Sequence, residues 1–118
     1  MFQITRLYSD ANGDSQFEDF NITLNDAGPI GLLSDPLKVK EIIFREVEAS
    51  YDYDFHNAPQ KQYLVLLDGE IEIEISTGKI RHFKAGDILL LEDTTGKGHK
   101  TKNLVAVKRR SIFITLPE

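Results

Sequence analysis

The amino-acid sequence predicts a small domain built from β-strands alone. Apolar and charged residues alternate with a period of two in Glu70–Ile75, the pattern of a strand with one buried and one solvated face. Other short β-rich segments are separated by Gly, Asn, Asp and Pro, which favour turns, and no window carries an apolar stripe at helical spacing. Strands that no helical layer covers must close on themselves. We therefore expect two antiparallel sheets in a small barrel, with under about a tenth of the residues in helix.

The first part of the chain contributes three expected strands. They cover residues 2–8, 17–24 and 39–47. The segments between these strands hold dipeptides that are typical of turns, namely Asn12-Gly13, Gly28-Pro29 and Asp35-Pro36.

The centre of the chain carries the strongest strand pattern. Residues 62–67 and 70–75 flank Asp68-Gly69, which predicts a tight hairpin because Gly adopts a positive φ without a steric penalty. Thr77-Gly78 predicts a second hairpin, which leads into a strand over residues 80–83.

The last third supplies the remaining strands. The turn Ala85-Gly86-Asp87 leads into residues 88–91, whose continuous apolar run predicts a strand buried on both faces. Two further β-rich segments, residues 104–107 and 111–116, bring the expected total to about nine short strands.

Length and composition exclude several classes of protein. The 118 residues fit a single domain over residues 1–118, with 41% hydrophobic and 28% charged residues. A net charge of -5 and scattered Lys and Arg argue against nucleic-acid binding. The chain has no cysteine, no signal-peptide pattern and no apolar run long enough to span a membrane, so we expect a cytoplasmic protein that contacts no membrane.

The central half of the chain contains two motifs in which polar residues recur at defined spacings. The first is His56-Asn57-Ala58, then Gln62, then six residues to Gly69; the second runs from Gly86 through Glu92 to His99 and Asn103. Over residues 51–103 these motifs resemble those of the cupin superfamily. Residues 51–59 and 92–99 also resemble a group of small bacterial cupin-like proteins. The resemblance implies a double-stranded β-helix, a small jelly-roll barrel with its chemistry at the barrel mouth.

The same resemblance predicts a weak metal site. Cupins usually hold their metal with three His and one Glu, and the matching positions here are His56, Ala58, Gln62 and His99. Only His56, His99 and Gln62 are candidate ligands, and a neutral amide oxygen binds Zn, Ni, Fe or Mn poorly. We therefore expect no tightly bound divalent ion.

Other side chains complete the predicted site. Adjacent Glu92 and Asp93 should point to opposite faces of a strand, so at most one faces the cavity. Gly96 and Gly98 should allow a bend that presents His99. His82 should face solvent, because Phe83 is the natural inward residue. The predicted ligand-binding residues are Tyr53, His56, Asn57, Gln62, Glu92, Asp93 and His99, over apolar walls of Phe55, Leu64, Leu66, Ile71 and Ile73.

Three functions remain open from the sequence. The first is small-molecule binding in the barrel mouth without catalysis. The second is a metal-dependent oxygenase, isomerase or lyase that uses His56 and His99. The third is a metal-free enzyme of the sugar-epimerase kind, with a His as base and Tyr53 as acid. A homodimer is also expected, because a strand over residues 2–8 at a sheet edge needs protection.

Overall fold

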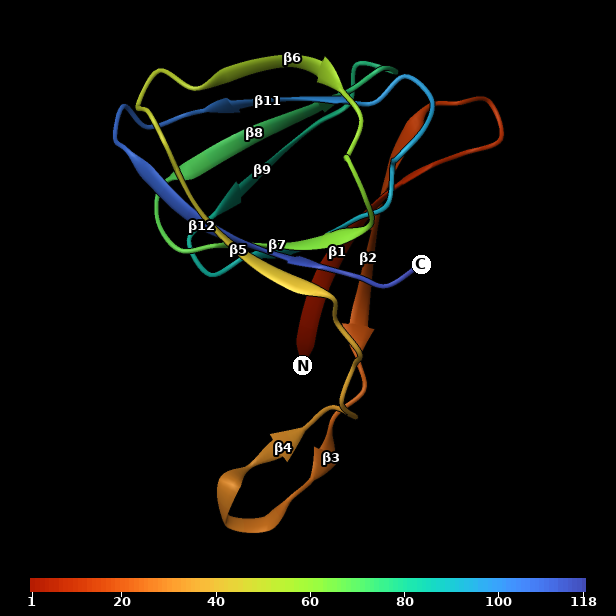
Figure 1. Ribbon diagram of the computed structural model, residues 1–118, viewed down its shortest axis with the longest axis vertical. Coiled ribbons are helices and arrows are strands. Elements are labelled where there is room, and N and C mark those ends of the chain that lie inside the picture. Colours follow the sequence, from red (N-terminus) through yellow and green to blue (C-terminus); the bar gives the residue numbers. More distant parts are fainter.

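Two β-sheets face each other in the computed structural model, which describes residues 1–118 (Figure 1). One sheet has six strands in the order β2-β1-β10-β7-β12-β5 and the other has four in the order β6-β11-β8-β9. The strands of the six-stranded sheet are β1 (Phe2–Ser9), β2 (Ser15–Ile22), β5 (Glu41–Val47), β7 (Gln62–Leu66), β10 (Ile88–Leu91) and β12 (Arg109–Thr115). Those of the four-stranded sheet are β6 (Asp52–His56), β8 (Glu70–Ile75), β9 (Ile80–Lys84) and β11 (His99–Asn103).

A short arm extends from the two sheets. It consists of β3 (Asn25–Asp26), a single 3-10 turn η1 (Gly28–Ile30) and β4 (Leu32–Leu33), and Figure 1 shows it as the hairpin at the bottom of the view. η1 is the only helical segment, and no helix has the length and apolar character needed to cross a membrane. The all-β prediction is confirmed, but the six-stranded sheet is not purely antiparallel as expected, because β1 and β10 pair in parallel.

The core lies between the inner faces of the sheets. Ile71, Ile73 and Ile75 of β8 are 0%, 1% and 0% exposed, as the period of two predicts. Phe83 of β9 joins them in the core, while His82 is exposed on the outer face beside Glu72. The expected orientations of His82 and Phe83 are therefore confirmed.

The turn at Asp68-Gly69 does not form the expected hairpin. β7 belongs to the six-stranded sheet and β8 to the four-stranded sheet, so the chain crosses between sheets at this turn. The Asp68 carboxylate fixes the crossing by accepting hydrogen bonds from the backbone N–H of Arg110 at 2.6 Å and from its Nε at 2.8 Å. The expected hairpin at Thr77-Gly78 is present, because β8 and β9 pair directly.

Strand propensity misplaced one segment of the four-stranded sheet. Residues 104–107 form bends, and their apolar members are 38–44% exposed. The strand is instead β11, whose sequence His-Lys-Thr-Lys-Asn has low β-propensity and whose two sides meet β6 and β8. Tertiary pairing overrides propensity there, since β11 supplies hydrogen bonds to both neighbours.

β1 and β10 also differ from expectation. β1 lies between β2 and β10, so it is not an edge strand; the edges of its sheet are β2 and β5. In β10, Leu89 and Leu91 are buried but Ile88 and Leu90 are only partly buried. Ile88 lines an apolar groove of about 340 Å³ between the outer face of the six-stranded sheet and the segment that includes β4. The outer face of β10 is thus not fully covered.

Candidate functional site: the pocket between the sheets

A pocket of about 410 Å³ lies between the inner faces of the two sheets. Its lining contains both apolar and polar side chains, and none of them is acidic. The lining residues are Ile43 and Arg45 of β5, Tyr51, Tyr53 and His56 on or beside β6, Asn57, Ala58, Pro59 and Gln60 of the following loop, Gln62 and Leu64 of β7, Leu91 of β10, His99 and Thr101 of β11, and Phe113 of β12.

A register shift in the β6–β11 pair places two aromatic rings in this pocket. His99 pairs with His56 and Thr101 with Tyr53, so three residue steps of β6 match two steps of β11. Tyr53 and His56 therefore face the same side, where their rings stack with centroids 4.0 Å apart. Phe55 is turned outward and is 42% exposed, so its predicted place in the cavity wall is wrong.

His99 and Asp93 form a buried pair behind the pocket wall. The Nδ1 atom of His99 lies 2.5 Å from Oδ2 of Asp93, and the Ser15 hydroxyl donates to the same oxygen at 2.8 Å. Asp93 is 0% exposed. Because a carboxylate only accepts, Nδ1 carries the proton, and Nε2 of a neutral His99 is left as an acceptor. The pair therefore fixes the orientation of the imidazole.

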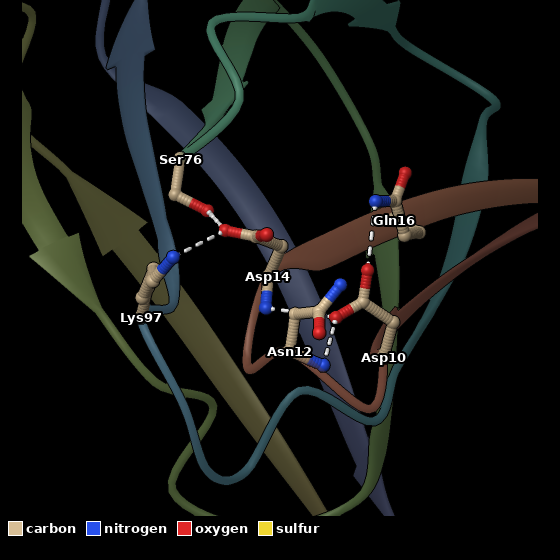
Figure 2. A network of polar contacts seen from close by, with 6 residues as sticks. All are labelled: Asp10, Asn12, Asp14, Gln16, Ser76 and Lys97. Carbon is tan, nitrogen blue, oxygen red and sulfur yellow. Dashed lines mark hydrogen bonds and ion pairs between the residues drawn. The ribbon is translucent and has the colours of Figure 1, made fainter.

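The loop that carries Asp93 and leads to His99 is tied to the rest of the barrel. Asp14, in the turn between β1 and β2, accepts hydrogen bonds from Ser76 at 2.6 Å and from Lys97 at 2.9 Å. Figure 2 shows this network of Asp10, Asn12, Asp14, Gln16, Ser76 and Lys97. The backbone N–H of Lys97 also donates to the carbonyl of Gly13 at 2.8 Å. The β1–β2 turn thus anchors the loop beside the pocket.

The structure brings most of the predicted site residues together. Tyr53, His56, Asn57, Gln62 and His99 all line the pocket. Asp93 supports the pocket from behind, through His99.

Glu92 lies outside the pocket. Its carboxylate pairs with Arg6 and, at 3.7 Å, with Lys61. As expected, Glu92 and Asp93 therefore diverge. Among the predicted apolar walls only Leu64 lines the pocket, whereas Leu66, Ile71 and Ile73 belong to the core.

Nine residues that line the pocket were not predicted as part of the site. They are Ile43, Arg45, Tyr51, Ala58, Pro59, Gln60, Leu91, Thr101 and Phe113. Arg45 had no readable signal, because Ile42 and Phe44 make the opposite face of β5 as apolar as its own. Tyr51 and Thr101 had none, because they depend on the register of β6 and β11.

His56 should make stability fall on mild acidification. Burial lowers the pKa of its imidazole below the ordinary value of 6.5, and this effect outweighs the hydrogen bond to the Asp54 carbonyl, which acts in the opposite direction. Its contribution to stability is therefore full above pH 6.5 and is lost as the pH falls through that lowered pKa. Urea unfolding at several pH values should show a steeper loss in the wild type than in His56→Asn. Parallel profiles would contradict this account.

The donor set does not fit the metal site of cupins. Of the four ligand positions, two hold imidazoles and the other two hold Ala58 and Gln62. The carboxylate of Asp93 is already hydrogen-bonded to His99 and Ser15. No group of three or more His, Cys, Asp or Glu side chains is arranged to hold a metal ion.

Calorimetric titration with zinc and nickel tests the expected lack of a tight site. The wild type should show no stoichiometric submicromolar binding, because only two neutral nitrogen ligands converge. Gln62→Glu should tighten binding by adding a charged ligand. A tight wild-type site that His99→Ala abolishes would show the expectation to be wrong.

Comparison with known proteins identifies the fold only. No protein-family model and no curated protein matches the sequence. A solved structure of an uncharacterized conserved protein with a double-stranded β-helix domain, from Klebsiella pneumoniae subsp. pneumoniae, is similar over 98% of this chain and 77% of its own, with a TM-score of 0.51 and 15% identity. An RmlC-like cupin protein from Desulfovibrio desulfuricans is similar over 97% and 82%, with a TM-score of 0.44 and 11% identity. The similarity to the Klebsiella structure shows that the chain has a double-stranded β-helix fold, as the sequence predicts.

Proposed function

We propose that the protein binds a small molecule in the pocket between the sheets. The pocket itself carries the proposal: about 410 Å³ of space whose apolar walls bear a few converging polar side chains. Ligand sites in proteins commonly have this size and this composition.

The side chains available to a ligand are of two kinds. Phe113 and Tyr53 offer ring surfaces against which apolar or planar groups can pack. Gln62, Thr101 and His99 offer hydrogen-bonding atoms, and all three are at most 8% exposed. A ligand with matching donors and acceptors can form hydrogen bonds to these side chains in the pocket.

A metabolite library screened by thermal shift tests this function. Compounds that raise the unfolding temperature of the wild type should fail to do so in Thr101→Phe, because the larger side chain occupies the pocket. Lys102→Phe is the matched control: it makes a similar change on the outer side of β11, where Lys102 pairs with Glu72, and should leave binding intact. Equal stabilisation of both variants would place the ligand elsewhere and contradict the proposal.

Metal-free acid–base catalysis is a second candidate function. The pair of Asp93 and His99 favours it, because a carboxylate at Nδ1 orients the ring and stabilises the imidazolium that forms when Nε2 takes a proton. In such a reaction His99 would remove a proton from carbon beside a carbonyl, and Tyr53 would donate one to the carbonyl oxygen.

Solvent exchange tests this candidate directly. Sugars and small keto compounds incubated with the protein in D2O should gain deuterium beside the carbonyl, as followed by NMR. His99→Ala should abolish the exchange. Exchange at the uncatalysed rate across the panel would count against catalysis and leave ligand binding standing.

The homodimer remains a prediction. The strand over residues 2–8 no longer supports it, because β1 is not an edge strand. The support for the dimer is now the apolar surface of β5 and the arm, where Phe44 is 75% exposed and Leu32 is 61% exposed. The molecular mass in solution, measured by light scattering, separates the dimer from a monomer of 13.4 kDa.

A further inference from the structure

We infer that the pocket takes a small organic anion, a carboxylate or a phosphate monoester, whose charged group pairs with Arg45. This inference rests on the proposed function and names the ligand class of the same site.

The arginines of the chain fall into two groups. Arg6, Arg81 and Arg110 each form an ion pair with a carboxylate outside the pocket. Arg45 and Arg109 lie toward the interior, and neither forms an ion pair with any carboxylate of the chain. Arg45, which is partly buried, and Arg109, which is buried, are thus the two arginines without a counter-ion.

Arg45 is the cation that lines the pocket. Its Nε donates to the buried hydroxyl of Ser111 at 3.1 Å, and its guanidinium lies 4.4 Å from the ring centre of Phe113. These contacts hold the stem of the side chain against β12. Burial lowers the pKa of Arg45, and the neighbouring Tyr51 acts in the opposite direction.

Arg109 adds a second charge at the same end of the barrel. It is 1% exposed, its Nε donates to Asn103 at 2.9 Å, and both of its terminal nitrogens are buried without a hydrogen-bond partner. The guanidinium groups of Arg109 and Arg45 lie 5.5 Å and 5.7 Å from the ring centre of Tyr51. Two cations therefore approach one aromatic ring beside the pocket.

The interior has too little negative charge to balance them. Asp93 is the only acidic residue among the buried ones, and it is engaged by His99 and Ser15. An uncompensated buried charge is costly, and an anion that enters the pocket would offset part of that cost. The planar fork of an Arg side chain suits carboxylate and phosphate oxygens in particular.

Benzoate and benzamide form a probe pair that tests the inference. They share size and shape and differ in charge, and their rings suit the aromatic walls of the pocket. We expect benzoate to bind the wild type at least about tenfold more tightly, or about 1.4 kcal/mol, in amide NMR titrations at low salt. Arg45→Met should remove the preference, so that the ratio of the two affinities falls to about one.

Arg110→Met is the matched control. It makes the same chemical change on β12, at an exposed position next to Arg109, and should keep the preference for benzoate. Circular dichroism shows whether each variant is folded. If Arg45→Met does not fold, Arg45→Lys replaces it; this variant keeps the charge but loses the fork and should retain only part of the preference.

The outcomes separate this inference from the proposed function. Equal binding of both probes in the pocket would overturn the anion inference and leave the binding function standing. A benzoate preference that persists in Arg45→Met would also overturn it, because the anion would then bind elsewhere. If neither probe shifts any pocket resonance, the inference and the proposed function both lose their support.

Discussion

Replacing Gly98 with alanine should destabilise the protein by roughly 3 kcal/mol or more. Gly98 has a φ of +76°, and a Cβ atom at this position would overlap the backbone carbonyl of His56. The two strands that carry His56 and His99 would have to separate. Urea unfolding measures the loss of stability, and the ring resonances of both histidines should shift with it.

Gly78→Ala is the matched control for this substitution. Gly78 has a similar φ of +90°, but no heavy atom lies within 4 Å of the position that the new methyl group would take. Its cost should be only the left-handed backbone strain of about 1 kcal/mol. Equal losses of stability in the two variants would contradict this account, because the close approach of Gly98 to His56 would then not explain why position 98 requires glycine.

Asp93→Asn should have the second-largest effect. We expect the free energy of unfolding to fall by about 2 kcal/mol, because a buried amide replaces a carboxylate that accepts hydrogen bonds from both Ser15 and His99. The amide can also donate to Nδ1, which moves the ring proton of His99 to Nε2. Nitrogen NMR of the His99 ring should therefore report the opposite tautomer, and ligand binding that uses Nε2 as an acceptor should weaken.

Glu92→Gln serves as the control for Asp93→Asn. Glu92 is the adjacent carboxylate, and it pairs with Arg6 and Lys61 outside the pocket. Its loss should cost less than about 1 kcal/mol, since partly exposed ion pairs contribute little, and should leave the His99 tautomer unchanged. An unchanged tautomer in Asp93→Asn would contradict the role assigned to this carboxylate.

The sequence predicts the fold class because its strongest signal is local. The alternation in β8 and the turn at Thr77-Gly78 depend only on neighbouring residues, and both are present in the structure. Motif spacing pairs His56 with His99, and the two meet across β6 and β11 with ring centres 4.5 Å apart. The spacing thus locates the centre of the candidate site.

Features that depend on distant pairing could not be predicted. The chain changes sheets at Asp68-Gly69, which has the local pattern of a hairpin. The register shift in β6 brings Tyr53 inward and turns Phe55 outward, and this choice arises from pairing with β11. That Arg45 forms no ion pair can also be known only from the three-dimensional positions of all the carboxylates.

Amide NMR mapping with the compounds that stabilise the wild type is the most direct test of a ligand site between the sheets. We expect the largest shifts to fall on residues that line the pocket, such as Tyr53, His99 and Thr101. Shifts centred on the outer groove, at Leu32, Ile88 and Ile114, would contradict it, because the binding surface would then be the opposite face of the six-stranded sheet.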